Sequence, residues 1–328
     1  MTQTSASGSF VVDQGVFADA AIDAATRAHN EMLIKAAGAA PDRWSRSPQD
    51  LRQDRRLGIG PFALQAQSPR AETFLVAGDG HAVPVRVIAP ESGAPTGCFL
   101  HLHGGGWMLG AADLQDERLA ETAARTGMAA LSVDYRLAPE HPYPAAADDC
   151  EAAALWLIGT AEKRFGTDRL VIGGESAGAH LSVVTLLRLR DKHRLNAFCG
   201  ANLTCGIFDL AMTPSMRAFI KPLVLARRDT EHFIDAFLQN GEDPGDPDVS
   251  PIHADLTGLP PALFSCGTRD GLIDDTLFMA ARWAAAGNET DVALWPGGPH
   301  AFQGMDMPLA AASNRRIDTW MGERIARP

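Results

Sequence analysis

Short apolar runs alternate with longer helical patterns over most of this chain, and this alternation limits the possible fold more than any other feature of the sequence. Such runs predict strands that are buried on both faces. Their alternation with helices predicts a mostly parallel sheet covered by helices on each side. The runs span residues 98–102, 129–133, 170–173, 199–203, 262–266 and 290–295.

Two more strands precede this pattern. Residues 72–77 and 83–88 flank the turn Gly78-Asp79-Gly80, which is a hairpin signal. The sequence therefore predicts an α/β fold with an eight-stranded sheet. The chain has 328 residues, which is long enough for two domains, but α/β proteins of this length are often one domain with an insertion. We expect the second arrangement.

Two parts of the chain do not follow the rhythm of strands and helices. The long connection before residue 262 has helical apolar spacing over residues 208–219 and 224–238, and residues 16–37 have a similar pattern. We expect these helices to form a cap over the strand ends, with packing or dimer contact as the alternative. The expected organisation is an N-terminal cap segment (1–50), α/β core (51–204), cap insertion (205–250) and α/β core (251–328).

Residues 174–178 carry the main chemical signal. Gly174-Glu175-Ser176-Ala177-Gly178 stands between the apolar run 170–173 and a helical pattern that starts at Ala179. A G-x-S-x-G sequence in this setting places the serine on a sharp strand-to-helix turn, with its Oγ exposed above the sheet. The next amide, that of Ala177, lies at a helix N-terminus, where a developing negative charge is favoured. Ser176 is therefore a candidate nucleophile.

The glycine loop His103-Gly104-Gly105-Gly106 follows a predicted strand. Consecutive glycines let the backbone turn with positive φ and bring its amides close to a ligand, as an oxyanion hole requires. A loop of this type is the specific partner of a G-x-S-x-G serine. The two motifs together indicate a hydrolase.

A serine nucleophile needs a base and an orienting carboxylate, and in hydrolases with this turn the acid follows the serine and the histidine comes last. His300 follows the last predicted strand and a flexible loop, which places it level with Ser176. Asp270 is the first acid past the preceding strand, whereas Asp274 and Asp275 are predicted to cap the next helix. The other histidines downstream of the turn helix are expected at the surface or in the cap; they are His193, His232 and His253.

These motifs resemble those of the bacterial hormone-sensitive-lipase-like (family IV) carboxylesterases of the α/β-hydrolase superfamily. The resemblance runs from about Val83 to the C-terminus and rests on residues 103–106, 134–145, 174–178, 270–272 and 300–302. The catalytic triad that it implies is Ser176, Asp270 and His300. The oxyanion hole that it implies consists of the backbone amides of Gly105, Gly106 and Ala177.

The resemblance also implies a substrate class and a cap. Proteins of this family hydrolyse short- to medium-chain acyl esters without a metal or an organic cofactor, and their N-terminus and insertion form a cap. One position departs from the family, because the residue before the nucleophile is often Asp or Thr and is Glu175 here. This departure leaves the chemistry intact and concerns the hydrogen bonding behind the turn.

Several other residues are candidates for a role near the site. Trp107, Met108 and Phe208 are large apolar residues expected to line the substrate pocket, with core packing as the alternative. Arg136 and Glu140 are expected to form an ion pair that holds a long loop in shape. The remaining histidines near the two motifs are expected to orient the glycine loop or to pack near the turn; they are His101, His103 and His180.

The charge and the cysteines argue against several classes of protein. A net charge of −11 disfavours binding to nucleic acid or to anionic membranes. The five cysteines are scattered without C-x-x-C spacing, which disfavours a disulfide framework or a zinc site. Because the N-terminus lacks a signal-peptide pattern and no stretch approaches the ~18 apolar residues of a membrane span, we expect a cytoplasmic protein.

The combined prediction is a serine carboxylesterase that acts on a small-molecule ester through an acyl-enzyme, with no cofactor and no metal. An amidase, a deacetylase or a lactonase on the same triad stays open, because one fold supports many leaving groups. A non-catalytic ligand receptor on the same fold is disfavoured, because such relatives lack the triad histidine that this chain retains as His300. A homodimer also stays open.

Overall fold

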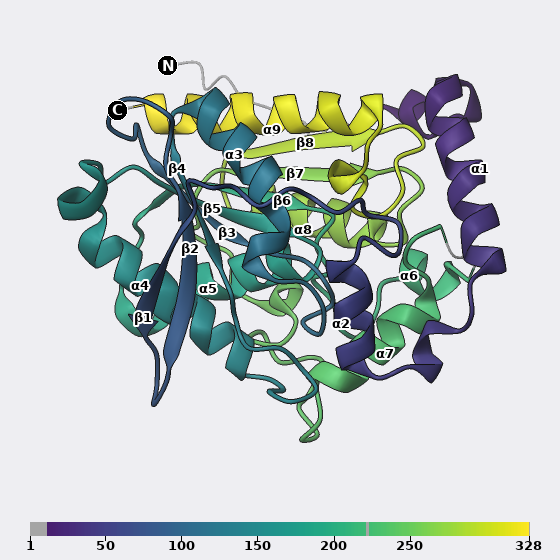
Figure 1. Cartoon of the computed structure of the whole chain (residues 1–328), viewed down its shortest axis with the longest axis horizontal. Coiled ribbons are helices and arrows are strands. Elements are labelled where there is room, and N and C mark those ends of the chain that lie inside the picture. Colours follow the sequence, from purple (N-terminus) through teal and green to yellow (C-terminus); the bar gives the residue numbers. More distant parts are fainter. Residues whose placement is uncertain (1–11, 221–222, 328) are drawn as a thin grey trace, which may run out of the picture.

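The computed structural model describes residues 12–220 and 223–327, and in this part of the chain eight strands form one sheet (Figure 1). The strand order is β1-β2-β4-β3-β5-β6-β7-β8. The ladders of β2 with β1 and with β4 are antiparallel, and the others are parallel. This confirms the predicted fold with a mostly parallel sheet. The strands are β1 (Glu72–Ala77), β2 (Ala82–Ile88), β3 (Cys98–Leu102), β4 (Ala129–Val133), β5 (Leu170–Glu175), β6 (Phe198–Thr204), β7 (Ala262–Gly267) and β8 (Thr290–Trp295).

Helices cover both faces of this sheet. Helices α3 and α9 pack on one face, where Leu119 and Trp320 join an apolar cluster with Phe99 of β3. Helices α4, α5 and α8 pack on the other face. Among the helices that the structure describes, none is both long and apolar enough to cross a bilayer. The helices on the sheet are α3 (Asp116–Thr126), α4 (Ala145–Phe165), α5 (Ala177–His193), α8 (Ile273–Ala285) and α9 (Pro308–Ala326).

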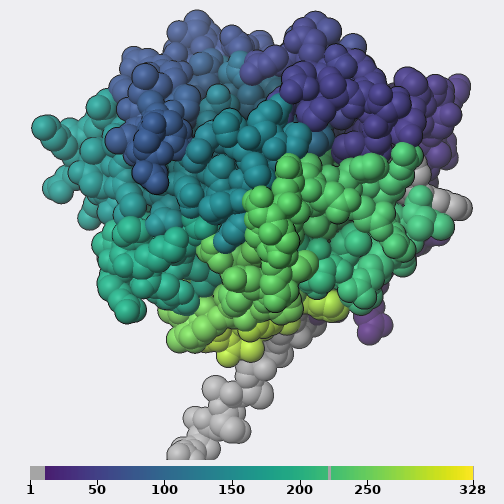
Figure 2. All heavy atoms as spheres, turned by 90° about the horizontal axis from the view of Figure 1, so that it is seen from below, coloured from purple at the N-terminus to yellow at the C-terminus, as the bar shows by residue number. Residues whose placement is uncertain are grey.

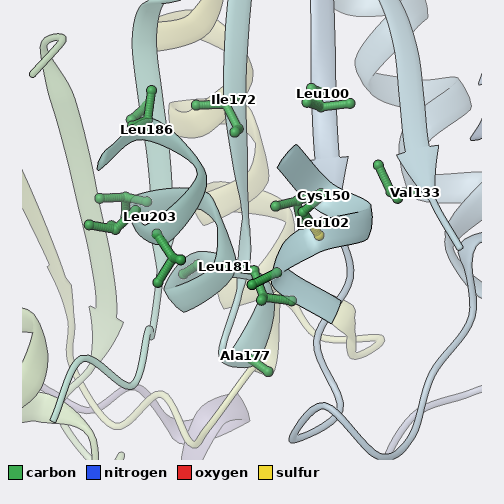
Figure 3. Packing of buried hydrophobic residues seen from close by; sticks show 14 of the residues in the cluster. Leu100, Leu102, Val133, Cys150, Ile172, Ala177, Leu181, Leu186 and Leu203 are labelled. Atoms are coloured by element: carbon green, nitrogen blue, oxygen red, sulfur yellow. The ribbon is translucent and has the colours of Figure 1, made fainter. Parts of the chain in front are cut away.

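Figure 3 shows the apolar layer between the sheet and helices α4 and α5. Leu100 of β3 and Ile172 of β5 contribute to this layer, and Leu181 of α5 packs in it. Their sequence neighbours Phe99 and Val171 pack on the α3 and α9 face instead, because successive side chains of a strand point to opposite faces. Each of these side chains contributes about 1.5–3 kcal/mol by leaving water. Strands β3, β4 and β7 are buried along their whole length, which explains their apolar sequence, whereas β1 at the edge of the sheet is mostly exposed.

The segments outside the sheet lie against each other. Figure 2 shows the purple N-terminal segment packed along the green segment between β6 and β7. Arg43 from the first segment and Phe233 from the second line one cavity together with Ser176. The predicted core boundary at residue 51 falls inside α2. The helices of these two segments are α1 (Ala24–Ala39), α2 (Pro48–Arg56), α6 (Pro214–Ala218) and α7 (Arg227–Phe237).

The structure corrects the length of the predicted N-terminal helix. The pattern over residues 16–37 contains the end of one 3-10 turn (Gln14–Phe17), a second one (Asp19–Ala21), and only then α1. The helix starts late because the Asp23 carboxylate accepts a hydrogen bond from the Thr26 amide at 2.8 Å and caps the first turn. An apolar period alone does not reveal where such a cap stands.

The predicted helix over residues 208–219 is mostly a loop that ends in the short α6. The Asp275 carboxylate accepts hydrogen bonds from the amides of Phe208 (2.7 Å) and Asp209 (3.0 Å), and these bonds replace helical ones. It also accepts the hydroxyl of Thr213 at 2.6 Å. Asp275 lies in the first turn of α8, as predicted, but the predicted capping role is wrong, because this fully buried carboxylate organises the connection after β6.

The predicted ion pair between Arg136 and Glu140 is also wrong. The Arg136 guanidinium pairs with Asp149 of α4 at 2.9 Å. Glu140 instead pairs with Arg52 of α2 at 2.6 Å. The loop after β4 is thus held to a core helix on one side and to an N-terminal helix on the other, through partners that lie far away in the sequence.

Candidate active site

Three strand ends bring the candidate catalytic side chains together. Ser176 follows β5, Asp270 follows β7 and His300 follows β8, and these parallel strands end at one edge of the sheet. His300 Nε2 lies 3.0 Å from Ser176 Oγ, and His300 Nδ1 lies 2.9 Å from Asp270 Oδ2. In this arrangement the Ser176 hydroxyl donates to the imidazole, and the Nδ1–H group donates to the carboxylate. The three side chains form one hydrogen-bonded chain.

The turn that carries Ser176 depends on the small residues around it. Ser176 has φ 55° and ψ −119°, a region that non-glycine residues rarely occupy. A Cβ on Gly174 would lie 1.9 Å from the Leu102 carbonyl oxygen, and one on Gly178 would lie 1.8 Å from the same atom. Any larger residue would therefore push the turn away from β3. This close approach is the physical reason for both glycines of the motif.

The glycine loop and the Ser176 turn line the same cavity. Gly105 and Gly106 have φ values of 126° and 60°, which residues with a side chain disfavour. Among the described residues, their amides have no hydrogen-bond acceptor. Ala177 is the first residue of α5, so its amide has no acceptor within the helix. Backbone donors placed in this way favour a developing oxyanion.

Glu175 links the two motifs. Its carboxylate accepts hydrogen bonds from the Gly104 amide (2.6 Å), from His101 Nε2 (3.0 Å) and from the side chain of Gln115. Burial raises the pKa of Glu175, but the imidazoles and hydrogen bonds outweigh burial and hold this pKa below its ordinary value. The residue that departs from the family pattern therefore ties the glycine loop to the serine turn. No local sequence pattern marks Gln115 as its partner.

The buried histidines His103 and His180 contact the glycine loop and the Trp107 side chain that follows it. His103 Nδ1 lies 3.0 Å from the Gly104 carbonyl oxygen, and the His103 ring stacks on Tyr135 with a centroid distance of 4.1 Å. His180 Nδ1 accepts a hydrogen bond from Trp107 Nε1 at 3.2 Å. Burial lowers the pKa of His103, and it lowers the pKa of His180 to about 4. Both rings are therefore neutral near pH 7.

His300 differs from these histidines in its charge environment. Burial alone would lower the pKa of His300, but the Asp270 carboxylate outweighs burial and holds this pKa well above its ordinary value of 6.5. The thiol of Cys205 also lies close, since ligand atoms of Cys205, Asp270 and His300 lie within 4.8 Å of one another. This trio has the spacing of metal ligands. A metal ion there would occupy atoms of the Asp270–His300 pair and compete with the hydrogen-bonded chain.

A cavity of about 180 Å³ is lined by Ser176 and His300 and extends to residues of α3 and α9. Trp107, Met108 and Phe208 are all buried in the hydrophobic core, and of these three residues expected to line the cavity only Trp107 does so. Position next to a motif does not decide to which side a side chain points, and this explains the difference. The cavity wall also includes residues outside the sheet that were not expected at the site, among them Arg55, Phe62, Leu225 and Phe233.

The chain is similar in sequence to known ester hydrolases. Residues 99–304 match a family described by the alpha/beta hydrolase fold. The carboxylic ester hydrolase LipN of Mycobacterium tuberculosis is 36% identical over 235 residues, which cover 69% of this chain and 62% of LipN, less than two thirds of that protein. The carboxylesterase NlhH of the same species is 34% identical over 263 residues, which cover 74% of this chain and 79% of NlhH.

A solved structure extends the similarity to the whole fold. A hormone-sensitive lipase from a metagenome library is 28% identical, with a TM-score of 0.80 over 93% of this chain and 99% of that one. The similarity therefore includes the segments outside the sheet as well as the matched core. The chain belongs to the α/β-hydrolase fold family, in its hormone-sensitive-lipase-like group of carboxylesterases.

Proposed function

We propose that this protein is a serine carboxylesterase in which Ser176 is the nucleophile, His300 is the base and Asp270 is the orienting carboxylate. The hydrogen-bonded chain between them, with distances of 3.0 Å and 2.9 Å, is the observation that carries the proposal. A serine hydroxyl is a weak nucleophile at pH 7, so a base in direct contact with it is what ester hydrolysis requires. The similarity to LipN and NlhH supports the same reaction.

In the proposed reaction, His300 takes the proton of Ser176 as Oγ attacks the ester carbonyl carbon. Asp270 stabilises the imidazolium that forms. The carbonyl oxygen becomes an oxyanion and accepts hydrogen bonds from the amides of the glycine loop and of Ala177. His300 then gives its proton to the leaving alcohol, which leaves an acyl group on Ser176. A water molecule that is deprotonated by the same imidazole hydrolyses this acyl-enzyme.

The size of the cavity supports small acyl groups as substrates. Its volume is about 180 Å³, and Leu225 and Phe233 form an apolar part of its wall. Each buried CH₂ contributes about 0.8 kcal/mol, so kcat/KM should rise with chain length until the cavity is full. We expect a maximum near about four to eight carbons and weak hydrolysis beyond about twelve.

A panel of p-nitrophenyl esters from acetate to palmitate, run beside an anilide and a lactone of similar size, tests this function. We expect ester hydrolysis that Ser176→Ala lowers by roughly 10⁴-fold or more, without a change in folding. A serine-directed organophosphate should label the wild-type protein at Ser176 and leave the variant unlabelled.

Several outcomes of this panel would contradict the proposal. Faster hydrolysis of the anilide or the lactone would favour the amidase or lactonase alternative. A preference for palmitate, or a jump in rate when substrate droplets appear, would mean that the cavity opens to long chains. Full activity in Ser176→Ala would refute the assignment of Ser176 as the nucleophile and with it the proposed triad.

We also infer that the described residues of segments 1–50 and 205–250, together with the rest of α2, act as a cap over the site. Residues from both segments line the cavity with Ser176, which supports this role. Each step of the reaction is assigned to a protein group, so we expect the activity to persist in the presence of a metal chelator such as EDTA.

A further inference from the structure

The arginines in the cavity wall differ in how their charges are matched. Arg43 pairs with Asp229 at 2.9 Å, and Arg118 pairs with Asp318 at 2.7 Å. Arg55, which lies on α2, makes no side-chain hydrogen bond and no ion pair with any described residue. One of the three positive charges that face the cavity therefore has no acceptor in the described part of the chain.

The neighbouring carboxylate does not supply that acceptor. Glu175 is the one acidic side chain among the described residues of the cavity wall, and its oxygens already accept three hydrogen bonds. It acts on Arg55 only as a nearby charge. The guanidinium is therefore left to water or to a ligand.

The surroundings of Arg55 hold its guanidinium in place. The Cζ atom lies 4.2 Å from the centroid of the Phe62 ring, and Phe62 also lines the cavity. Burial lowers the pKa of Arg55, and the charge of Glu175 offsets part of this effect. An arginine stays protonated under these conditions, and the half-buried Arg55 side chain leaves its N–H donors within reach of water or a ligand.

The other arginines at the end of α2 show the contrast. Arg52 donates to the Ala138 carbonyl oxygen at 2.8 Å and pairs with Glu140. Arg56 pairs with Asp113 at 3.0 Å and does not line the cavity. Arg55 thus stands between two arginines that have structural partners, and it alone of the three faces the cavity.

We propose that Arg55 binds a carboxylate on the substrate, so that the preferred ester carries a second, unesterified acid group. The planar guanidinium offers two parallel N–H donors that match the two oxygens of a carboxylate. This inference rests on the proposed esterase function and adds a charge preference to it. The carboxylate belongs either to the acyl part, as in a hemiester of a dicarboxylic acid, or to the alcohol part.

Two pairs of esters distinguish these sources. For the acyl part, p-nitrophenyl hydrogen glutarate is compared with the neutral p-nitrophenyl pentanoate. For the alcohol part, para-butyryloxybenzoate is compared with its methyl ester. The quantity measured is the ratio of kcat/KM for the acidic ester to kcat/KM for its neutral counterpart, in the wild type and in Arg55→Met, Arg55→Lys and Arg56→Met.

We expect Arg55→Met to lower this ratio by roughly ten- to a hundredfold for at least one pair, as the loss of a charged hydrogen bond predicts. Methionine retains much of the length and packing of arginine, so the change is mainly one of charge. Arg55→Lys should keep part of the preference, because it retains the charge without the planar fork. The matched control Arg56→Met should keep the wild-type ratio.

A ratio in Arg55→Met that equals the wild-type ratio for both pairs would overturn the inference while leaving the esterase function intact. A binding measurement separates the two proposals further. In the Ser176→Ala background, p-nitrophenyl hydrogen glutarate should bind by calorimetry at least about tenfold more tightly with Arg55 than with Met at that position. Equal affinities would overturn the charge preference, whereas a lack of Ser176-dependent turnover with any ester would overturn the esterase function.

Discussion

The floor of the candidate site and the proposed cap are built in different ways. The floor consists of the ends of β3, β5, β7 and β8 with the glycine loop and the start of α5, and the cap consists of α1, α2, α6 and α7. Helix α5 buries every residue from Ala177 to Leu189, whereas the buried residues of α1 are Thr26 and Leu33. The floor is therefore continuous with the hydrophobic core, whereas α1 of the proposed cap buries few of its own residues.

The two regions also differ in what holds them. In the floor, backbone approaches backbone so closely that a Cβ at Gly174 or Gly178 would overlap a carbonyl oxygen of β3. In the cap, side chains from distant segments meet, as where Trp44 Nε1 donates to Asp229 Oδ1 at 2.8 Å. Changes in the floor should therefore alter the rate of the chemical step, and changes in the cap should alter substrate binding.

The largest effect that separates the regions is expected at Asp270. Asp270→Asn should lower kcat by roughly 10⁴-fold, because an amide favours the wrong tautomer of His300. The matched control is Asp274→Asn, since Asp274 accepts the Ser215 amide at 2.8 Å and makes no contact with His300. The control should lose at most ~1 kcal/mol of stability and keep its rate. An inactive Asp274→Asn beside an active Asp270→Asn would refute this assignment.

A smaller loss of rate is expected when the link between the serine turn and the glycine loop is removed. Glu175→Ala should lower kcat by roughly a hundredfold with less change in KM, because the amides of the oxyanion loop lose their fixed position. Glu175→Gln should recover most of this loss, since its side-chain oxygen still accepts the Gly104 amide. Steady-state kinetics on variants with matched circular dichroism spectra measure both. Equal rates for the two variants would show that Glu175 does not position the loop.

The pH dependence of kcat/KM should reflect the effect of the Asp270 charge on the pKa of His300. Catalysis needs His300 neutral, and its pKa is held well above 6.5, so kcat/KM should fall as the pH drops through that raised pKa. Each further pH unit below it should cost about tenfold. A pH profile of kcat/KM between pH 5 and 9 tests this, and a half-maximal point below the ordinary histidine pKa would contradict the raised value.

The smallest effects are expected in the cap. Asp229→Ala removes the acceptor of both Trp44 Nε1 and Arg43, so it should cost about 1–3 kcal/mol of stability. We expect KM to rise several-fold and kcat to change little, because the floor stays intact. Asp229→Asn, which keeps one acceptor oxygen, is the milder control. A loss of kcat with KM unchanged would erase the distinction between cap and floor.

The fold and the floor could be predicted because their signals are local. The strands at residues 72–77, 98–102, 129–133 and 290–295 have the bounds that the sequence predicted. The cap was less predictable, since the start of α1 depends on a single capping carboxylate at Asp23. The loop after β6 depends on Asp275, which is more than fifty residues away in the sequence.

The sequence by itself determined the succession of strands along the chain and the residue types of the candidate site, because apolar runs and the two motifs each act within a few residues of backbone. Only the tertiary structure decided which side chains face the cavity. Arg55 and Arg56 are neighbours on one helix, yet the first lines the cavity and the second pairs with Asp113. Trp107 and Met108 are adjacent and both buried in the core, yet only Trp107 also lines the cavity. These differences arise from contacts between segments far apart in the chain, which no local spacing encodes.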